Sequence, residues 1–269
     1  MSILLPGTRT GREPERSIRR GPRRLPAEVV AATQRDRLLD GIVRTVAHNG
    51  YARARISDIC QAAGVTRPVF YEQFEGKEDA FLAAHRHGTS LVVASMEAAF
   101  AAAPDWPSGI RSALGTLLGI LAEAPAFATM AVVEIDAVGA AGRAEREALL
   151  ARFRPFFTPE VPSLVPHTEL VDVVVGGVYA SIYRRIDAGR VAELPGLLPT
   201  LSYFVMAPFL GLDGPGGAAA RASEPVRAVI ASAPPCLTGF AGPALDRHET
   251  DAPSTPGSHK PLDPTTTAE

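Results

Sequence analysis

The stretch AGVTRPVFYEQF at residues 63–74 constrains the fold more than any other part of the sequence. Gly64 permits a sharp bend, Thr66 is a favourable helix N-cap, and Pro68 fits the first turn of a helix. Proline is tolerated there because the amide hydrogen that it lacks would have no partner at that position. A short helix is therefore predicted from Thr66 to about Phe74, directly after a tight turn.

Helical periodicity flanks this stretch on both sides. Residues 35–50 combine an apolar stripe with a polar side and end at Asn49-Gly50, a pair typical of a helix C-terminus. The apolar stripe contains Leu38, Leu39, Ile42, Val43, Val46 and Ala47, and the polar side contains Arg35, Asp36, Asp40 and Arg44. A shorter periodic pattern over 56–63 predicts a second helix, and a fourth helix is predicted from Lys77.

Two short helices joined by a tight turn and preceded by a longer amphipathic helix form a helix-turn-helix. Phe70 and Phe74 are four residues apart, so we expect them to pack the third helix against the first two. The other side of the third helix, which includes Tyr71, then faces solvent. The expected core of the motif contains Ile59, Ala63, Gly64, Val65, Phe70 and Phe74.

Residues 35–82 resemble the TetR family of bacterial transcriptional regulators. The family pattern is matched by Gly50-Tyr51, Ile59, Ala63-Gly64-Val65, Thr66, Phe70-Tyr71, Phe74 and Lys77-Glu78. The resemblance implies a homodimer that binds near-palindromic double-stranded DNA, a small-molecule effector bound after the fourth helix, and no cofactor. Arg55 departs from the pattern, because the family usually has a threonine there that caps the second helix and touches phosphate. An arginine can pair with phosphate, but it does not cap a helix as a hydroxyl does.

Candidate DNA contacts follow from the chemistry of the third helix. Arg67 occupies the first exposed position, where a guanidinium reaches guanine O6 and N7, and Pro68 and Val69 suit thymine methyl groups. Glu72 either accepts a hydrogen bond from cytosine N4 or is solvated. Tyr71 either reaches a phosphate through its hydroxyl or is simply a packed aromatic residue. The expected phosphate contacts are Arg55, Thr66, Tyr71 and Lys77.

The rest of the chain shows few strand signals and is predicted to be all-helical. Helices are expected over 105–123, 125–139, 141–154, 167–188 and 194–210. We therefore expect an all-α protein with a helix-turn-helix DNA-binding domain over 28–82. The fourth helix is expected to join it to a helical effector-binding and dimerisation domain over 83–211. The flanking segments 1–27 and 212–269 are expected to be disordered, because they offer little apolar surface.

Two groups of residues in the second domain are candidates for function. The candidate dimer interface contains Gly176, Gly177, Ala180, Ser181, Leu201 and Phe204. The same residues also suit an ordinary core within one subunit. The candidate effector pocket contains Trp106, Phe127, Met130, Glu134, Phe153, Tyr179 and Tyr183. Aromatic residues at helical spacing also form cores, and Glu134 either orients a ligand or faces water.

Arginines are concentrated at the N-terminus. Residues 1–27 contain seven arginines and two glutamates, although the formal net charge of the whole chain is −2. Such asymmetry is typical of an arm that binds a polyanion such as DNA, but a solvated tail has the same composition.

Other functions find little support in the sequence. The motifs of serine hydrolases, Walker loops, zinc proteases and dinucleotide-binding proteins are missing, and His85 and His87 point to different faces of a helix, so neither an enzyme nor a metal site is expected. Cys60 and Cys236 form no disulfide framework and no apolar stretch is long enough to span a membrane, so a cytoplasmic location is expected. Alternatives to a ligand-responsive repressor are a ligand-independent activator, an architectural DNA-binding protein and a helix-turn-helix that never touches DNA.

Overall fold

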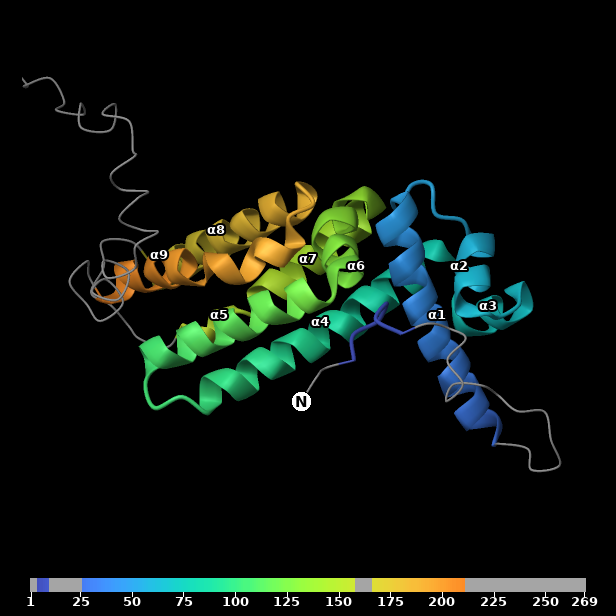
Figure 1. Ribbon diagram of the computed structural model, residues 1–269, viewed down its shortest axis with the longest axis horizontal. Helices are drawn as coiled ribbons and strands as arrows, with labels where there is room; N and C mark the ends of the chain where they lie inside the picture. Colours follow the sequence, from blue (N-terminus) through green and yellow to red (C-terminus); the bar gives the residue numbers. More distant parts are fainter. Residues whose placement is uncertain (1–3, 10–25, 158–165, 211–269) are drawn as a thin grey trace, which may run out of the picture. The chain divides into compact units, whose positions relative to one another are not determined.

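The computed structural model describes residues 4–9, 26–157 and 166–210. All of them belong to one of the two units into which the chain divides, Met1–Ala231. Within these residues the regular secondary structure is helical (Figure 1), which confirms the predicted all-α fold. The expectations for residues 10–25 of the arginine-rich arm and for the tail 212–269 lie outside the described residues.

The helices have bounds close to those predicted. They are α1 (Ala27–Asn49), α2 (Ile56–Ala63), α3 (Arg67–Gln73), α4 (Lys77–Ala101), α5 (Trp106–Glu123), α6 (Pro125–Ala128), α7 (Ala140–Ala151), α8 (His167–Asp187) and α9 (Leu198–Leu210). A π-helical turn occupies Thr129–Val133, and 3-10 turns occupy Glu134–Val138, Arg154–Phe156 and Val191–Leu197. Helix α1 begins earlier than predicted, because its apolar stripe predicts a start near residue 35. The stripe marks only the buried part of that helix, since residues 27–37 are exposed or half-buried.

Helix α2 packs closely against α1 at Gly41. A Cβ atom at this position would lie 2.9 Å from the carbonyl oxygen of Ile59 and 3.0 Å from the Cβ of Ala63. These distances are shorter than an ordinary van der Waals contact, so the absence of a side chain allows the two helices to approach. Leu38 and Ile42 of the predicted stripe are buried on the same helix.

The N-terminal segment Leu4–Arg9 packs on α1. Leu5 is buried, and the amide of Gly7 donates a hydrogen bond to Oδ1 of Asp40 at 2.7 Å. The expected disorder of 1–27 is therefore wrong for these residues, because a turn seated on α1 buries an apolar side chain and pairs a backbone amide. Asp40, expected on the polar side of α1, is only 1% exposed for the same reason.

The sequence predicts one helix over 125–139, but the structure divides it into α6, the π turn and a 3-10 turn. Two contacts from distant parts of the chain coincide with this division. The hydroxyl of Tyr179 donates to the carbonyl of Val132 at 2.8 Å, and a carboxylate oxygen of Glu134 accepts the backbone N–H of Tyr51 at 2.7 Å. Periodicity alone does not reveal such partners. Turns of this π type are frequent at functional sites.

Helices α4 and α5 lie side by side, and α5 also contacts α9 (Figure 1). The buried apolar residues of α1–α3 and those of the later helices form one continuous cluster. Among the described helices, none is by itself long and apolar enough to cross a membrane. Only α5 together with Pro125–Val138 reaches that length and composition, and the pair is bent by 105°.

Candidate functional site

The turn between α2 and α3 closes with backbone hydrogen bonds around Gly64. This residue has φ of +65° and ψ of 37°, the left-handed conformation that glycine adopts without strain. The amide of Val65 donates to the carbonyl of Cys60 at 3.0 Å, and the amide of Gly64 donates to that of Gln61 at 3.2 Å. This pair of bonds is a Schellman cap, which ends α2 and sets the direction in which α3 begins.

Helix α3 has a buried side and an exposed side. Phe70 and Phe74 are buried, and their ring centroids lie 5.7 Å apart. The candidate base contacts Arg67, Pro68 and Glu72 are exposed, as is the candidate phosphate contact Tyr71, whereas Val69 is half-buried. Of the other residues expected in the core, Ile59 and Ala63 are buried and Val65 is half-buried, whereas Gly64 is exposed because it forms the turn after α2. The packing of the phenylalanines therefore leaves one side of α3 available to a partner.

Two candidate phosphate contacts stand at helix starts. Arg55 is the N-cap of α2 and Thr66 is the N-cap of α3, and both are exposed. Neither side chain caps its helix: Arg55 has no acceptor, and the hydroxyl of Thr66 makes no capping hydrogen bond. The sequence predicts that Thr66 is the N-cap of the third helix, and it does occupy the N-cap position of α3. Its side chain, however, does not make the expected capping hydrogen bond.

Lys77, the remaining candidate phosphate contact, is engaged inside the protein. Its Nζ donates to the backbone carbonyl of Tyr51 at 2.8 Å and lies 4.3 Å from the centroid of the aromatic ring of Tyr51. The lysine thereby ties the start of α4 to the loop between α1 and α2. Its contact with phosphate stays a prediction.

Arg35 is a contact that the sequence pattern did not reveal. Its Nη1 donates to the carbonyl of Gln73 at 3.0 Å, and its Cζ lies 4.5 Å from the centroid of Phe74. Both contacts join α1 to the end of α3. The pattern placed Arg35 on the polar side of α1, which is correct, but it gave no sign of what that side faces.

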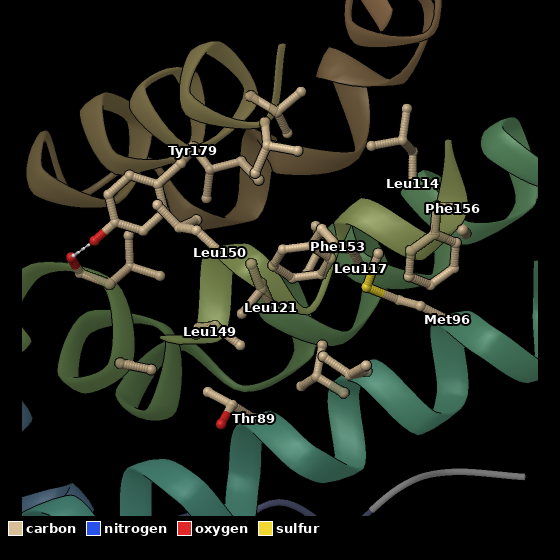
Figure 2. A pocket seen from close by; sticks show the side chains of 18 of the residues that line it. Thr89, Met96, Leu114, Leu117, Leu121, Leu149, Leu150, Phe153, Phe156 and Tyr179 are labelled. Carbon is tan, nitrogen blue, oxygen red and sulfur yellow. Dashed lines mark hydrogen bonds between the residues drawn. The ribbon is translucent and has the colours of Figure 1, made fainter. Parts of the chain in front are cut away.

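A second candidate site is a cavity of about 110 Å³ among the later helices. Figure 2 shows side chains from several of these helices converging on it. Its wall comprises Thr89, Val92, Val93 and Met96 of α4; Ile110, Ala113, Leu114, Leu117 and Leu121 of α5; Phe127, Ala131 and Val132; Leu149, Leu150, Phe153, Phe156 and Phe157; and Val175, Val178, Tyr179, Ile182 and Val205.

The cavity wall is apolar. Among the described lining side chains only those of Thr89 and Tyr179 carry a polar group. Each hydroxyl already donates a hydrogen bond, from Thr89 to the carbonyl of His85 at 2.7 Å and from Tyr179 to that of Val132 at 2.8 Å. Burial, and then the nearby carboxylate of Asp136, raise the pKa of Tyr179 to about 12, so this hydroxyl stays protonated and remains a donor.

The predicted pocket residues divide into two groups. Phe127, Phe153 and Tyr179 line the cavity, whereas Trp106, Met130, Glu134 and Tyr183 do not. The indole N–H of Trp106 donates to the carbonyl of Phe156 at 2.8 Å, which places the tryptophan behind the wall. Met130 is fully buried in the core, and Glu134 points to Tyr51. Tyr183 packs 6.5 Å from Tyr179, centroid to centroid, one turn further along α8. Side-chain bulk identifies these positions, but it does not distinguish wall from core.

Tyr51 links the cavity to the helix-turn-helix. Its N–H donates to Glu134, its carbonyl accepts from Lys77, and its ring packs 5.2 Å from that of Phe81. Glu134 lies two residues after Val132, the last residue of this segment that lines the cavity. The hydrogen bond between Glu134 and Tyr51 therefore joins the cavity wall to the loop that precedes α2.

The candidate interface residues of α8 and α9 are partly used within the chain. A Cβ at Gly177 would lie 2.7 Å from the ring of Phe204, so these two positions already pack together. Leu201 is buried, and Ala180 and Ser181 are half-buried. Gly176, in contrast, has open space where a Cβ would lie. Beside it Val173 is 69% exposed, and Phe204 is 40% exposed.

Residues 38–84 match the model of the family described as bacterial regulatory proteins, tetR family. No curated protein sequence matches the chain. Among solved structures, the fatty acid degradation regulator FadR from Bacillus halodurans is 17% identical with a TM-score of 0.58, over 73% of this chain and 99% of that one.

The transcriptional regulator FadR from Bacillus subtilis, solved in complex with stearoyl-CoA, is 16% identical with a TM-score of 0.57, over 65% of this chain and 97% of that one. A putative TetR-family transcriptional regulator from Mesorhizobium loti is 16% identical with a TM-score of 0.50, over 66% and 97% of the two chains. At these identities the likeness concerns the fold. Residues 38–84 therefore carry the helix-turn-helix of the bacterial tetR family of regulatory proteins, and the chain shares the fold of these regulators.

Proposed function

We propose that this transcriptional regulator represses genes by binding a near-palindromic operator as a homodimer, and that a small, largely apolar effector in the cavity releases the DNA. The observation that carries the proposal is the continuity between the cavity wall and Tyr51. The segment that lines the cavity at Ala131 and Val132 ends in Glu134, which holds the loop that precedes α2.

The exposed side of α3 supports the DNA-binding part of the proposal. Arg67 stands at its first turn, where a guanidinium suits guanine, and Tyr71 adds a phenolic hydroxyl for a phosphate. One helix of this length reads few bases, so a second copy is needed for a specific site. The exposed Val173 and Phe204 beside Gly176 supply an apolar face on which two copies can associate.

The wall of the cavity supports an effector that is mainly hydrocarbon. Its two described hydroxyls are both engaged, so most of the binding free energy must come from burial of apolar surface. The FadR of Bacillus subtilis, which shares this fold, was solved with stearoyl-CoA, a molecule with a long hydrocarbon chain. A hydrocarbon group of this kind is the chemistry that the present wall accepts.

The coupling between effector and operator is proposed to run through Glu134. A ligand that expands the cavity pushes on Ala131 and Val132, and the carboxylate two residues further on is bonded to Tyr51. Lys77 donates to the carbonyl oxygen of Tyr51, so both backbone polar groups of this residue are held. A shift of this loop alters the position of α2 and α3 relative to α1, which gives the bound and free states different affinities for DNA.

The test begins with a duplex selected from a random pool and with straight-chain alcohols, acids and alkanes as probes. We expect at least one probe to lower operator affinity, measured by fluorescence anisotropy. Glu134→Ala should bind the same probe in calorimetry, because Glu134 lies outside the cavity wall, yet its operator affinity should respond little. Glu147→Ala, at an exposed position of α7, is the matched control and should respond as the wild type does.

A second variant locates the probe. Ala113→Phe fills the cavity from α5 and should abolish probe binding, whereas Ser112→Phe, at the exposed neighbouring position, should not. A probe that raises operator affinity would overturn the proposal that the effector releases the DNA. A protein that binds a specific operator but responds to no probe would fit the ligand-independent activator. A protein that binds DNA without sequence preference and ignores every probe would instead be an architectural protein.

A further inference from the structure

His85 is a buried polar group that the proposed function does not yet use. Its side chain lies on α4 and is 0% exposed. Neither ring nitrogen makes a hydrogen bond of good geometry within the part of the chain that the structure describes, although the carbonyl of Ala131 lies near the ring. Its Nδ1 lies 4.0 Å from Oε1 of Glu145 on α7, too far for a direct hydrogen bond. Buried polar atoms in native proteins are nearly always paired, so this ring suits a further polar partner.

The position of His85 connects it to the cavity. It precedes the lining residues Thr89, Val92 and Met96 on the same stripe of α4, one helical turn before the first of them. Glu145 likewise precedes the lining residue Leu149 by one turn of α7. Figure 2 shows Thr89 and Leu149 at one end of the cavity, away from Met96. His85 and Glu145 therefore lie just beyond that end of the apolar wall.

The charge state of the pair limits what it can bind. Burial lowers the pKa of His85, although the Glu145 carboxylate and the Ala131 carbonyl oppose that shift, so the ring is neutral near pH 7. A neutral imidazole offers one donor and one acceptor. The other oxygen of Glu145, Oε2, accepts from Nε of Arg86 at 2.7 Å, so the carboxylate is already paired with a guanidinium on its solvent side.

We propose that His85 and Glu145 form a polar end to the cavity that receives a hydroxyl group of an otherwise apolar effector. This inference rests on the proposed function, in which the cavity binds that effector. A hydroxyl both donates and accepts, so it can accept from the ring N–H of His85 and donate to the nearby carboxylate oxygen of Glu145. A carboxylate on the ligand would be repelled by Glu145 and would meet no cation in the neutral ring. An alkane would leave both ring nitrogens without partners.

The test compares 1-octanol, octanoate and n-octane as probes of the full-length protein. Binding is followed by calorimetry and by the fluorescence of Trp106, the single tryptophan of the chain, which is bonded to the lining residue Phe156. We expect the wild type to bind 1-octanol at least about tenfold more tightly than octanoate. His85→Leu should weaken 1-octanol binding about tenfold, the effect of one lost buried hydrogen bond, and should leave n-octane binding unchanged or tighter.

Matched variants separate this effect from a general disturbance. His87→Leu, at an exposed position two residues along α4, should bind every probe as the wild type does. His85→Gln keeps a donor and an acceptor and should retain part of the preference for 1-octanol. Glu145→Ala, on a half-buried residue near the surface, should weaken 1-octanol several-fold and provides the test if His85→Leu does not fold.

The outcomes distinguish the two proposals. If n-octane binds and Ala113→Phe blocks it, but His85→Leu affects 1-octanol and n-octane equally, the effector cavity stands and the hydroxyl site is wrong. Equal wild-type affinity for octanoate and 1-octanol would also overturn the hydroxyl site. If the wild type binds none of the three probes, both this site and the apolar effector cavity are wrong.

Discussion

At the scale of single residues, Arg67 and Tyr71 occupy the same exposed side of α3 but should contribute to DNA binding differently. Arg67→Ala should cost roughly 1–3 kcal/mol and relax the preference at one base step, because a bidentate contact to guanine is lost. Tyr71→Phe should weaken binding to all sequences alike, because a phosphate contact carries no base information. Selection from random duplexes with each variant separates the two roles. An unchanged sequence preference in Arg67→Ala would show that another residue reads the operator.

The buried ring of His85 predicts a dependence of stability on pH. Burial lowers the pKa of this histidine in the folded state. The carboxylate of Glu145 raises that pKa and the positive charge of Arg86 lowers it, but burial has the largest effect. The unfolded chain therefore binds a proton more readily than the folded one. Stability should therefore fall as the pH drops below about 6.5, by up to about 1.4 kcal/mol per pH unit, until the folded-state pKa is reached.

Denaturant unfolding of the wild type and of His85→Leu at several pH values measures this contribution. The variant should lose this part of the slope below about pH 6.5, whereas His87→Leu should keep it. Identical slopes in the wild type and in His85→Leu would mean that the ring takes up a proton as readily in the folded protein as in the unfolded chain, against the inference drawn from its burial.

At the scale of elements, α8 and α9 present the surface on which dimerisation should depend. Gly177→Leu is a poor probe, because a side chain there would strike Phe204 within the same subunit. Gly176→Leu meets no neighbour within the subunit, so it should fold normally yet weaken the dimer by about 1–3 kcal/mol if a second copy covers this face. Light scattering over a concentration series measures the dissociation.

The matched control for this prediction is Gly119→Leu. Gly119 is a helical glycine of α5 that also has open space at its Cβ, and it lies outside the predicted interface. Both replacements favour helix formation to the same extent, so a general effect on folding would appear in each. Equal dissociation of the wild type and Gly176→Leu would place the interface elsewhere.

At the scale of the whole molecule, the arginine-rich arm should add salt-dependent affinity for DNA. Deletion of the entire arm is unsuitable, because Leu5 and Gly7 are packed on α1. Replacement of the arginines between residues 10 and 25 by serine leaves that packing intact. Neutralising about three phosphates per subunit contributes close to −5 to the slope of log K against log salt for a dimer, so the variant should have a flatter slope.

The experiment measures operator affinity at several salt concentrations, with thermal stability as the control. Stability should change little, because the replaced arginines lie outside the described core. A variant that retains the full slope would show that the arm does not contact DNA, and its charge would then need another partner.

Much of the helix-turn-helix could be predicted because its signals are local. Gly64 sets the turn, Pro68 stands in the first turn of α3, and the spacing of Phe70 and Phe74 determines which side of α3 is buried. Each of these signals acts through the backbone or through neighbours one turn away. The bounds of most later helices follow in the same way, from glycine and proline at their ends.

The contacts that give the molecule its sites join distant residues, and only the tertiary structure decides them. Tyr51 and Glu134 are separated by 83 positions, and no periodic pattern relates His85 to Glu145. An apolar side chain has the same helical spacing whether it fills a core or lines a cavity, so Met130 and Phe127 are indistinguishable in the sequence. The sequence by itself therefore determined most of the helices and which side of α3 is exposed. The cavity, its polar end and its link to the helix-turn-helix depend on volumes and partners that exist only after the helices pack.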